Sequence, residues 1–155
     1  MRKFGTFISL LFLIAIIGFA APSSSISGSK ENAQDDRFIA NDNGVVKDTE
    51  TGLEWYAGPD KDTNWNEAKR WVESLNVAGG GWRMPTRKEL KALYKMGAGK
   101  RNMTPLLKTT GWQVWSGETM GSSFAWGFGF GSGFEALDKR VFSHNRRGFA
   151  VRSRR

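Results

Sequence analysis

The stretch FAWGFGFGSGF, residues 124–134, places an aromatic ring at every second position from Phe124 to Phe130, with Ala or Gly between the rings. This period of two is typical of a β-strand, whose alternate side chains point to opposite faces of a sheet. We expect Trp126, Phe128 and Phe130 to pack in the core beneath helices; a surface that stacks sugar rings is the alternative. The glycines indicate that a backbone segment or a ligand lies close to the other face, because glycine otherwise weakens a strand.

Two amphipathic segments precede this strand. Residues 64–76 place apolar side chains at helical spacing, and Asn64 with Glu67 forms a capping-box pattern at their start. A second capping box, formed by Thr86 and Glu89, opens the segment RKELKALYKM, whose leucines share one helical face. Three consecutive glycines separate the two segments. The sequence therefore predicts two helices.

The rest of the pattern predicts β-structure. Residues 37–56 carry two turn signals, Asn43-Gly44 and Thr49–Gly52, between short apolar runs, which indicates a hairpin. From Gly111 onward the helical period is lost and the residues alternate as in strands. The fold class expected is α+β, with two helices packed on antiparallel strands.

The chain begins with the features of a secretory signal peptide, over residues 1–20. Two basic residues precede an apolar run over residues 7–19, and small residues lie near Ala20. The run is shorter than the roughly 20 residues of a membrane-spanning helix, so we expect cleavage and export, with an uncleaved anchor as the alternative. Residues 21–36 are polar and are expected to be a flexible linker. This leaves residues 37–155 as one folded domain of a periplasmic or extracellular protein.

Charge suggests what this domain binds. The chain has 23 Lys and Arg against 15 Asp and Glu, and no acidic residue follows Asp138. A dense run of arginines attracts a polyanion such as a sulfated glycan, because the planar guanidinium donates two parallel hydrogen bonds to sulfate or phosphate. Arg146 and Arg147 are expected to face solvent; the alternative is that the acidic first hairpin neutralises the basic end. The residues predicted to form the ligand site are Arg140, Arg146, Arg147, Arg152 and Trp115.

No catalytic pattern stands out. The chain has no Cys, and its single His144 lies in a basic stretch without a nucleophile elbow elsewhere. A relay of serine, His144 and Asp138 is conceivable but has no further support. The acidic residues fit no calcium loop. We therefore expect neither enzyme activity nor a metal or cofactor, and nucleic acid is a poor partner for an exported domain.

Six segments occur in an order that resembles the Lcl C-terminal domain family. The most specific is Trp82-Arg83-Met84-Pro85-Thr86 with Glu89-Leu90, which is similar to the signature of that family. Two positions depart from the pattern: Val72 and Ser153 stand where many relatives carry Cys, and no collagen-like repeat precedes the domain. The matching segments are VVKDTETGLEW, NWNEAKRWVESL, GGGWRMPTRKELKAL, VWSGE, AWGFGF and GFAVRSRR.

The resemblance implies a C-type-lectin-like fold, in which the N- and C-terminal strands lie adjacent. It also implies an extracytoplasmic, adhesion-type binding function. Together with the basic C-terminus, this favours a non-catalytic module for an anionic glycan or cell-surface ligand. A protein-partner module of the cell envelope is the alternative, and an enzyme is a third class that lacks a visible nucleophile.

Overall fold

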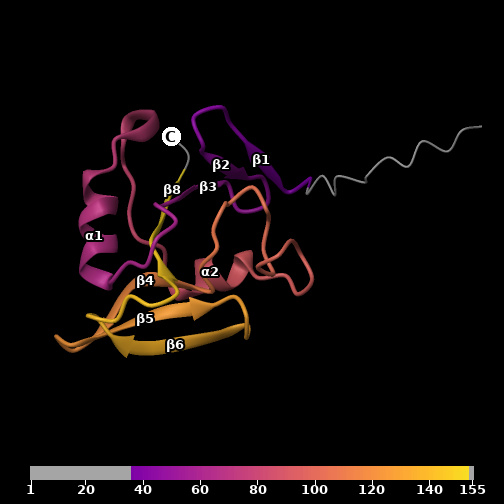
Figure 1. Ribbon diagram of the computed structural model, residues 1–155. Helices are drawn as coiled ribbons and strands as arrows, with labels where there is room; N and C mark the ends of the chain where they lie inside the picture. The colour runs from indigo at the N-terminus through magenta and orange to yellow at the C-terminus, as the bar shows by residue number, and fades with distance from the viewer. Residues whose placement is uncertain (1–35, 154–155) are drawn as a thin grey trace, which may run out of the picture. The chain divides into compact units, whose positions relative to one another are not determined.

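The computed structural model describes residues 36–153 (Figure 1). The predicted signal peptide and the predicted linker up to residue 35 lie outside the described residues, as do the last two arginines. Within the described part of the chain, no helix is both long and apolar enough to cross a membrane. The folded part contains two helices and two four-stranded sheets, which confirms the α+β class.

The first sheet joins the beginning of the domain to its end. Its strands are β1 (Phe38–Ala40), β2 (Val46–Asp48), β3 (Leu53–Ala57) and β8 (Phe149–Ser153), in the order β1-β2-β3-β8, and all neighbours are antiparallel. The predicted hairpin is confirmed as β2 and β3. The expectation that the N- and C-terminal strands are direct neighbours is wrong, because β2 and β3 lie between β1 and β8.

The second sheet contains the aromatic ribbon. Its strands are β4 (Gln113–Met120), β5 (Phe124–Gly129), β6 (Phe134–Lys139) and β7 (Arg146–Arg147), in the order β6-β5-β4-β7. The ribbon strand β5 lies between β6 and β4 and is antiparallel to both. The two-residue strand β7 pairs with β4 in parallel, which the alternation in the sequence did not predict.

Both predicted helices are present with their capping boxes. Helix α1 is Trp65–Ser74, helix α2 is Arg87–Leu93, and a short 3-10 turn, η1 (Val77–Gly79), follows α1. In each capping box, the side chain of Asn64 or Thr86 accepts from the backbone of the glutamate three residues on, and that glutamate accepts from the cap residue. Both helices end earlier than expected, because Leu75 and Tyr94 already have extended backbones.

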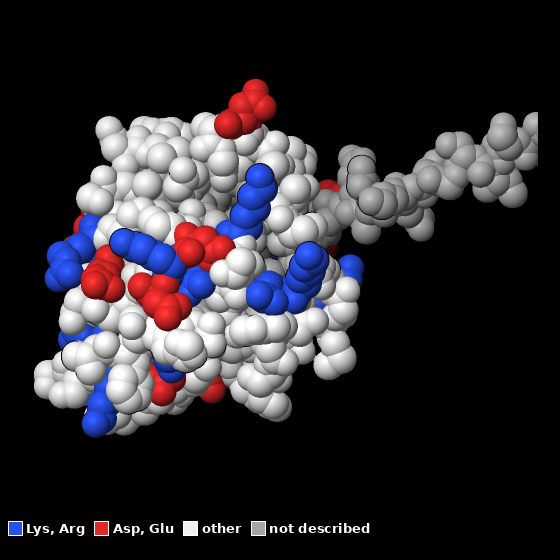
Figure 2. Space-filling view, viewed as in Figure 1, with Lys and Arg blue, Asp and Glu red and all other residues white. Residues whose placement is uncertain are grey.

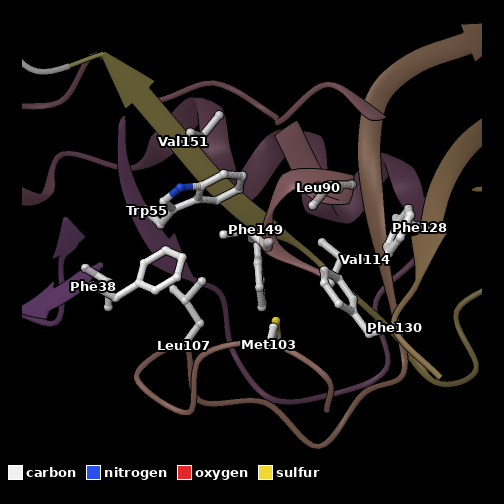
Figure 3. Close-up of a cluster of buried hydrophobic side chains, with 12 residues drawn as sticks. Phe38, Trp55, Leu90, Met103, Leu107, Val114, Phe128, Phe130, Phe149 and Val151 are labelled. Carbon is white, nitrogen blue, oxygen red and sulfur yellow. The ribbon is translucent and has the colours of Figure 1, made fainter. Parts of the chain in front are cut away.

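The main core lies between the two sheets and α2 (Figure 3). Phe128 and Phe130 are fully buried there with their rings 5.1 Å apart, so the core interpretation of the ribbon is confirmed for these two rings. It is wrong for Trp126, which is only half-buried: the guanidinium of Arg87 lies 4.3 Å from the centroid of its ring. Helix α1 packs on the other side of the second sheet, where Trp65 and Ala68 meet Trp115.

The glycines of the ribbon are explained by close backbone and ring contacts. A Cβ at Gly127 would lie 2.8 Å from the carbonyl oxygen of Val114 on the neighbouring strand. A Cβ at Gly133, where φ is +76°, would lie 2.9 Å from the ring of Tyr94. Positive φ favours glycine, because a side chain there is strained. The groups that lie close to these glycines are therefore other parts of the protein.

Candidate functional site

Trp115, one of the predicted ligand contacts, is a core residue. It is 1% exposed, and its Nε1 donates to the carbonyl oxygen of Thr63 at 2.9 Å. The guanidinium of Arg146 lies over its ring, 5.0 Å from the centroid, and pairs with Asp138. A ligand therefore has no access to the Trp115 ring.

Arg147 is buried rather than solvent-facing. Its Nε donates to Asp60 at 2.7 Å, one Nη donates to Asp62 at 2.9 Å, and the other donates to the Thr110 hydroxyl at 3.1 Å. Its stem packs so closely on Gly111 that a Cβ there would lie 2.5 Å from the Arg147 Cγ. The expectation of exposure was wrong because the fold brings Asp60, Asp62 and Gly111 against this side chain at the edge of the second sheet.

Arg146 is also unavailable to solvent. Its side chain is 12% exposed and lies between the Trp115 ring and the carboxylate of Asp138. The prediction that it faces solvent is therefore wrong. Its backbone pairs with Gln113 of β4, so the strand holds the guanidinium against the sheet.

Arg152 and Arg140 stabilise the fold in a similar way. Arg152 pairs with Glu54 at 2.7 Å, across strands β8 and β3, which confirms that the first hairpin neutralises part of the basic end. Arg140 donates to the side-chain oxygen of Asn66 at 2.6 Å, and its guanidinium lies 3.9 Å from the centroid of the Trp65 ring. Neither guanidinium is a free anion-binding group.

Stacking of arginine on tryptophan is a general feature of this domain. Five of the seven Trp rings lie beneath a guanidinium, because a planar, weakly hydrated cation is attracted to the face of an indole. Charge pairing is common as well: on the face drawn in Figure 2, blue and red side chains lie next to one another. The stacked pairs are Arg87 with Trp126, Arg101 with Trp112, Arg140 with Trp65, Arg146 with Trp115 and Arg152 with Trp82.

The Arg147 network also determines the protonation of its acidic partners. Burial raises the pKa of Asp60, but hydrogen bonds from Arg147 and Thr110 outweigh it and bring that pKa down to about 2. The hydrogen bond from Arg147 likewise lowers the pKa of Asp62. Both carboxylates are therefore ionised at neutral pH and hold the segment before α1 against β7.

The lysines behave differently from the arginines. Between Glu89 and Glu118 the sequence has no acidic residue. Among the described lysines only Lys69 forms an ion pair. Sequence reasoning missed the cationic surface on α2 and the segment that follows it, although the acid-free stretch was a visible signal. We use the name lysine surface for the exposed lysines of α2 and of the segment after it. They are Lys88, Lys91, Lys95, Lys100 and Lys108.

An open cleft of about 300 Å³ lies beside the lysine surface, between Lys91 of α2 and the turn that joins β5 to β6. Phe134, at the start of β6, lines it with a side chain that is 73% exposed. Glu135, which also lines it, is held by Arg87 at 2.9 Å. The cleft therefore offers an exposed ring next to an unpaired ammonium group.

The residues considered for catalysis or metal binding are separated. His144 is exposed, 3.4 Å from a carboxylate oxygen of Asp62, whereas Asp138 pairs with Arg146. The relay of serine, His144 and Asp138 considered from the sequence is therefore not assembled, because Asp138 pairs with Arg146 instead. Among residues 36–153, no group of three or more His, Cys, Asp or Glu side chains is arranged to hold a metal ion.

The fold and these surfaces define a mixed α+β domain whose aromatic residues and arginines stabilise the structure. Residues 44–152 match the Lcl C-terminal domain family, so the chain belongs to that family. The matched residues include both helices and all the strands, apart from β1 and the last residue of β8. Arg83 and Glu89 of its signature pair at 2.6 Å. No curated protein sequence matches the chain.

Proposed function

We propose that this domain is a non-catalytic binding module of an exported, periplasmic or extracellular protein, and that its ligand is an anionic glycan or another cell-surface polyanion. A C-type-lectin-like arrangement of the two sheets is part of this proposal. One observation supports it most directly: the lysine surface is exposed and forms no ion pair within the described residues, and all its members except Lys88 lie in a stretch of sequence without acids. An unpaired ammonium group is available to a sulfate, phosphate or carboxylate, whereas a guanidinium held by a carboxylate is not.

The proposal moves the ligand site away from the arginines. Arg140, Arg146, Arg147 and Arg152 are each engaged by other residues of the domain, so replacing them would test folding. The lysines can be replaced with little change in stability, because surface substitutions usually alter the free energy of unfolding by less than about 0.5 kcal/mol.

Binding to heparin, as a sulfated probe, tests this site. One variant replaces Lys91, Lys95, Lys100 and Lys108 with Gln. A matched control removes the same number of charges elsewhere, by replacing Lys47, Lys69, Arg70 and Lys139 with Gln. The first variant should lose about tenfold or more in affinity, equal to about 1.4 kcal/mol, and the control should lose much less. The wild-type affinity should fall steeply with salt, because exposed charges are screened within about 8 Å at physiological ionic strength.

Equal losses in the two variants would contradict a site on the lysine surface, since only net charge would then matter. Export is a separate part of the proposal and has its own test. Terminal sequencing of protein recovered outside the cytoplasm should find a chain that starts at Ala21. An intact N-terminus would indicate an uncleaved anchor instead.

A protein-partner module is the second candidate, supported by a different observation. Three apolar side chains are exposed at the end of the second sheet where β4 meets β5 and β6 ends: Met120 at 52%, Val141 at 70% and Phe142 at 49%. Exposed apolar residues that lie together are typical of interaction surfaces. Salt-insensitive binding to a protein, lost on replacing Val141 and Phe142 with Ser, would favour this candidate over the glycan.

A further inference from the structure

A groove of about 180 Å³ lies between helix α1 and the loop before it, away from α2 and the lysine surface. The loop contributes Pro59, Lys61 and Thr63. Helix α1 contributes Trp71, and further lining comes from Gly148, just before β8. None of these residues takes part in the anion site proposed above, so the groove requires its own explanation.

One wall of the groove is the indole ring of Trp71, which lies against Gly58 and Gly148. A Cβ at Gly58 would lie 3.1 Å from the Trp71 ring and 2.4 Å from the carbonyl oxygen of Gly148, so only glycine allows this approach. A Cβ at Gly148 would lie 3.0 Å from Ala68, on the same helix as Trp71. The Trp71 ring is half-buried and stacks on Tyr56 with the ring centroids 6.4 Å apart, and its Nε1 donates to no protein group among the described residues. The indole therefore supplies an apolar surface beside the polar groups of the rim.

The rim offers one charge of each sign. Lys61 is exposed and forms no ion pair within the described residues. Glu67 accepts from the backbone of Asn64 through one carboxylate oxygen, at 2.9 Å, which leaves its other oxygen available. The carboxylate of Glu67 would repel an anionic ligand, and the ammonium group of Lys61 would repel a cationic one. The rim therefore favours a neutral ligand that has both hydroxyl donors and acceptors.

The loop wall is fixed before any ligand arrives. The Gly58 N–H donates to the carbonyl oxygen of Gly148 at 2.9 Å, and the Thr63 N–H donates to that of Arg146 at 3.1 Å. Arg147 holds the segment between these points through Asp60 and Asp62. A rigid wall reduces the entropy lost on binding, which is a main cost for a small ligand.

We propose that the groove beside Trp71 binds one neutral sugar ring of hexose size. An apolar wall with a few convergent polar groups is the usual composition of a small-molecule site. The apolar face of a sugar ring would lie on the exposed part of the indole, while its hydroxyl groups would reach the ammonium of Lys61 and the free oxygen of Glu67. This site is independent of the lysine surface and of the anionic ligand proposed for it.

The test is a titration of the domain with the methyl glycosides of glucose, galactose, mannose and N-acetylglucosamine, followed by the indole N–H resonances. At least one sugar should shift the Trp71 resonance with a millimolar dissociation constant and leave that of the exposed Trp112 unchanged. Glu67→Gln keeps a capping side chain and Lys61→Met keeps the stem, so both should fold. Each should weaken binding about tenfold. Trp71→Ala should abolish it and Trp112→Ala should not.

Binding of the sugar should survive in high salt and in the lysine-surface variant, so failure of the anion site would leave this result intact. If no sugar shifts the Trp71 resonance, the proposal is wrong. If indole or phenol shifts it while the sugars do not, the groove is a pocket for an apolar side chain and the proposal is equally wrong. Binding that is unchanged in Lys61→Met and Glu67→Gln would also overturn it.

Discussion

Replacing Arg147 with Met is the sharpest test of the view that the basic C-terminal end stabilises the domain. Met fills much of the volume of the arginine stem but removes the charge and the side-chain hydrogen bonds to Asp60, Asp62, Thr110 and the carbonyl oxygen of Arg146. Loss of one partner from a buried ion pair usually costs about 3 to 5 kcal/mol. Here Asp60 is 38% exposed and Asp62 is 47% exposed, so both regain water easily. We therefore expect a loss of about 2 to 3 kcal/mol in the free energy of unfolding.

This loss should appear as a fall in melting temperature of about 10 °C, because 1 kcal/mol corresponds to roughly 4 °C in a domain of this size. It should also depend on pH. The pKa of Asp60 in the folded state is about 2, below its unfolded value. Its contribution is therefore complete above the unfolded pKa, about 3.9, and is lost as the pH falls through the folded value. The difference between wild type and Arg147→Met should shrink over that range.

Urea denaturation of both proteins at neutral and acidic pH measures these effects. A triple variant, in which Arg147→Met is combined with Asp60→Asn and Asp62→Asn, serves as the control. It should recover part of the lost stability, since no charge is then left without its partner. An unchanged urea midpoint in Arg147→Met would refute the reasoning and would make Arg147 available again as a ligand contact.

Other predictions concern the ribbon and the helix caps, and each is checked by the urea midpoint. Phe128→Ala should lower the free energy of unfolding by about 3 to 5 kcal/mol, because the ring is fully buried. Trp126→Ala should lower it by about 1 to 2 kcal/mol, because it removes a half-buried ring on which a guanidinium is stacked. Equal losses would contradict the assignment of Trp126 to the edge of the core. Gly133→Ala should cost about 1 to 3 kcal/mol, since φ is +76° and the new Cβ meets Tyr94, and a neutral result would mean that this turn adapts. Thr86→Ala should cost about 1 kcal/mol through loss of the cap, with Thr86→Ser nearly neutral.

Local features of the fold were predictable from the sequence. The capping boxes at Asn64 and Thr86 depend on residues three positions apart, so the pattern alone identifies where each helix begins. The helix ends were less predictable, because Tyr94 leaves the helix to pack beside Phe128 and against the backbone of Gly133. That contact joins distant parts of the chain, and no local pattern contains it.

The ligand site was predicted poorly for the same physical reason. The arginines near the C-terminus look unpaired in a sequence that has no acid after Asp138. Arg147 nevertheless pairs with Asp60, 87 positions away, and Arg152 with Glu54, 98 positions away. A count of charges along a chain does not report ion pairs that the fold makes between its two ends.

The chemistry of the two basic side chains explains which of them the fold uses. Arginine can bind a carboxylate with two parallel hydrogen bonds and lie flat on an indole, so a domain rich in Trp and without disulfides has many places to bury it. Lysine is a strongly hydrated point charge that loses more on burial. Every described arginine except Arg70 pairs with a carboxylate or stacks on a ring, while every described lysine except Lys69 forms no ion pair. In a domain of this kind, lysines in an acid-free stretch are therefore a better guide to an exposed cationic site than a run of arginines.

Arg147 links the stability of the domain to the proposed sugar groove without touching it. Its carboxylate partners lie on the loop that contributes one wall, and the adjoining Gly148 also lines the groove. A buried ion pair adds little net stability compared with apolar residues of the same volume, so its value here is that it fixes one position of the loop. Arg147, which the sequence predicted to contact a ligand, thus lies behind the proposed groove, where it holds the loop that lines one side of it.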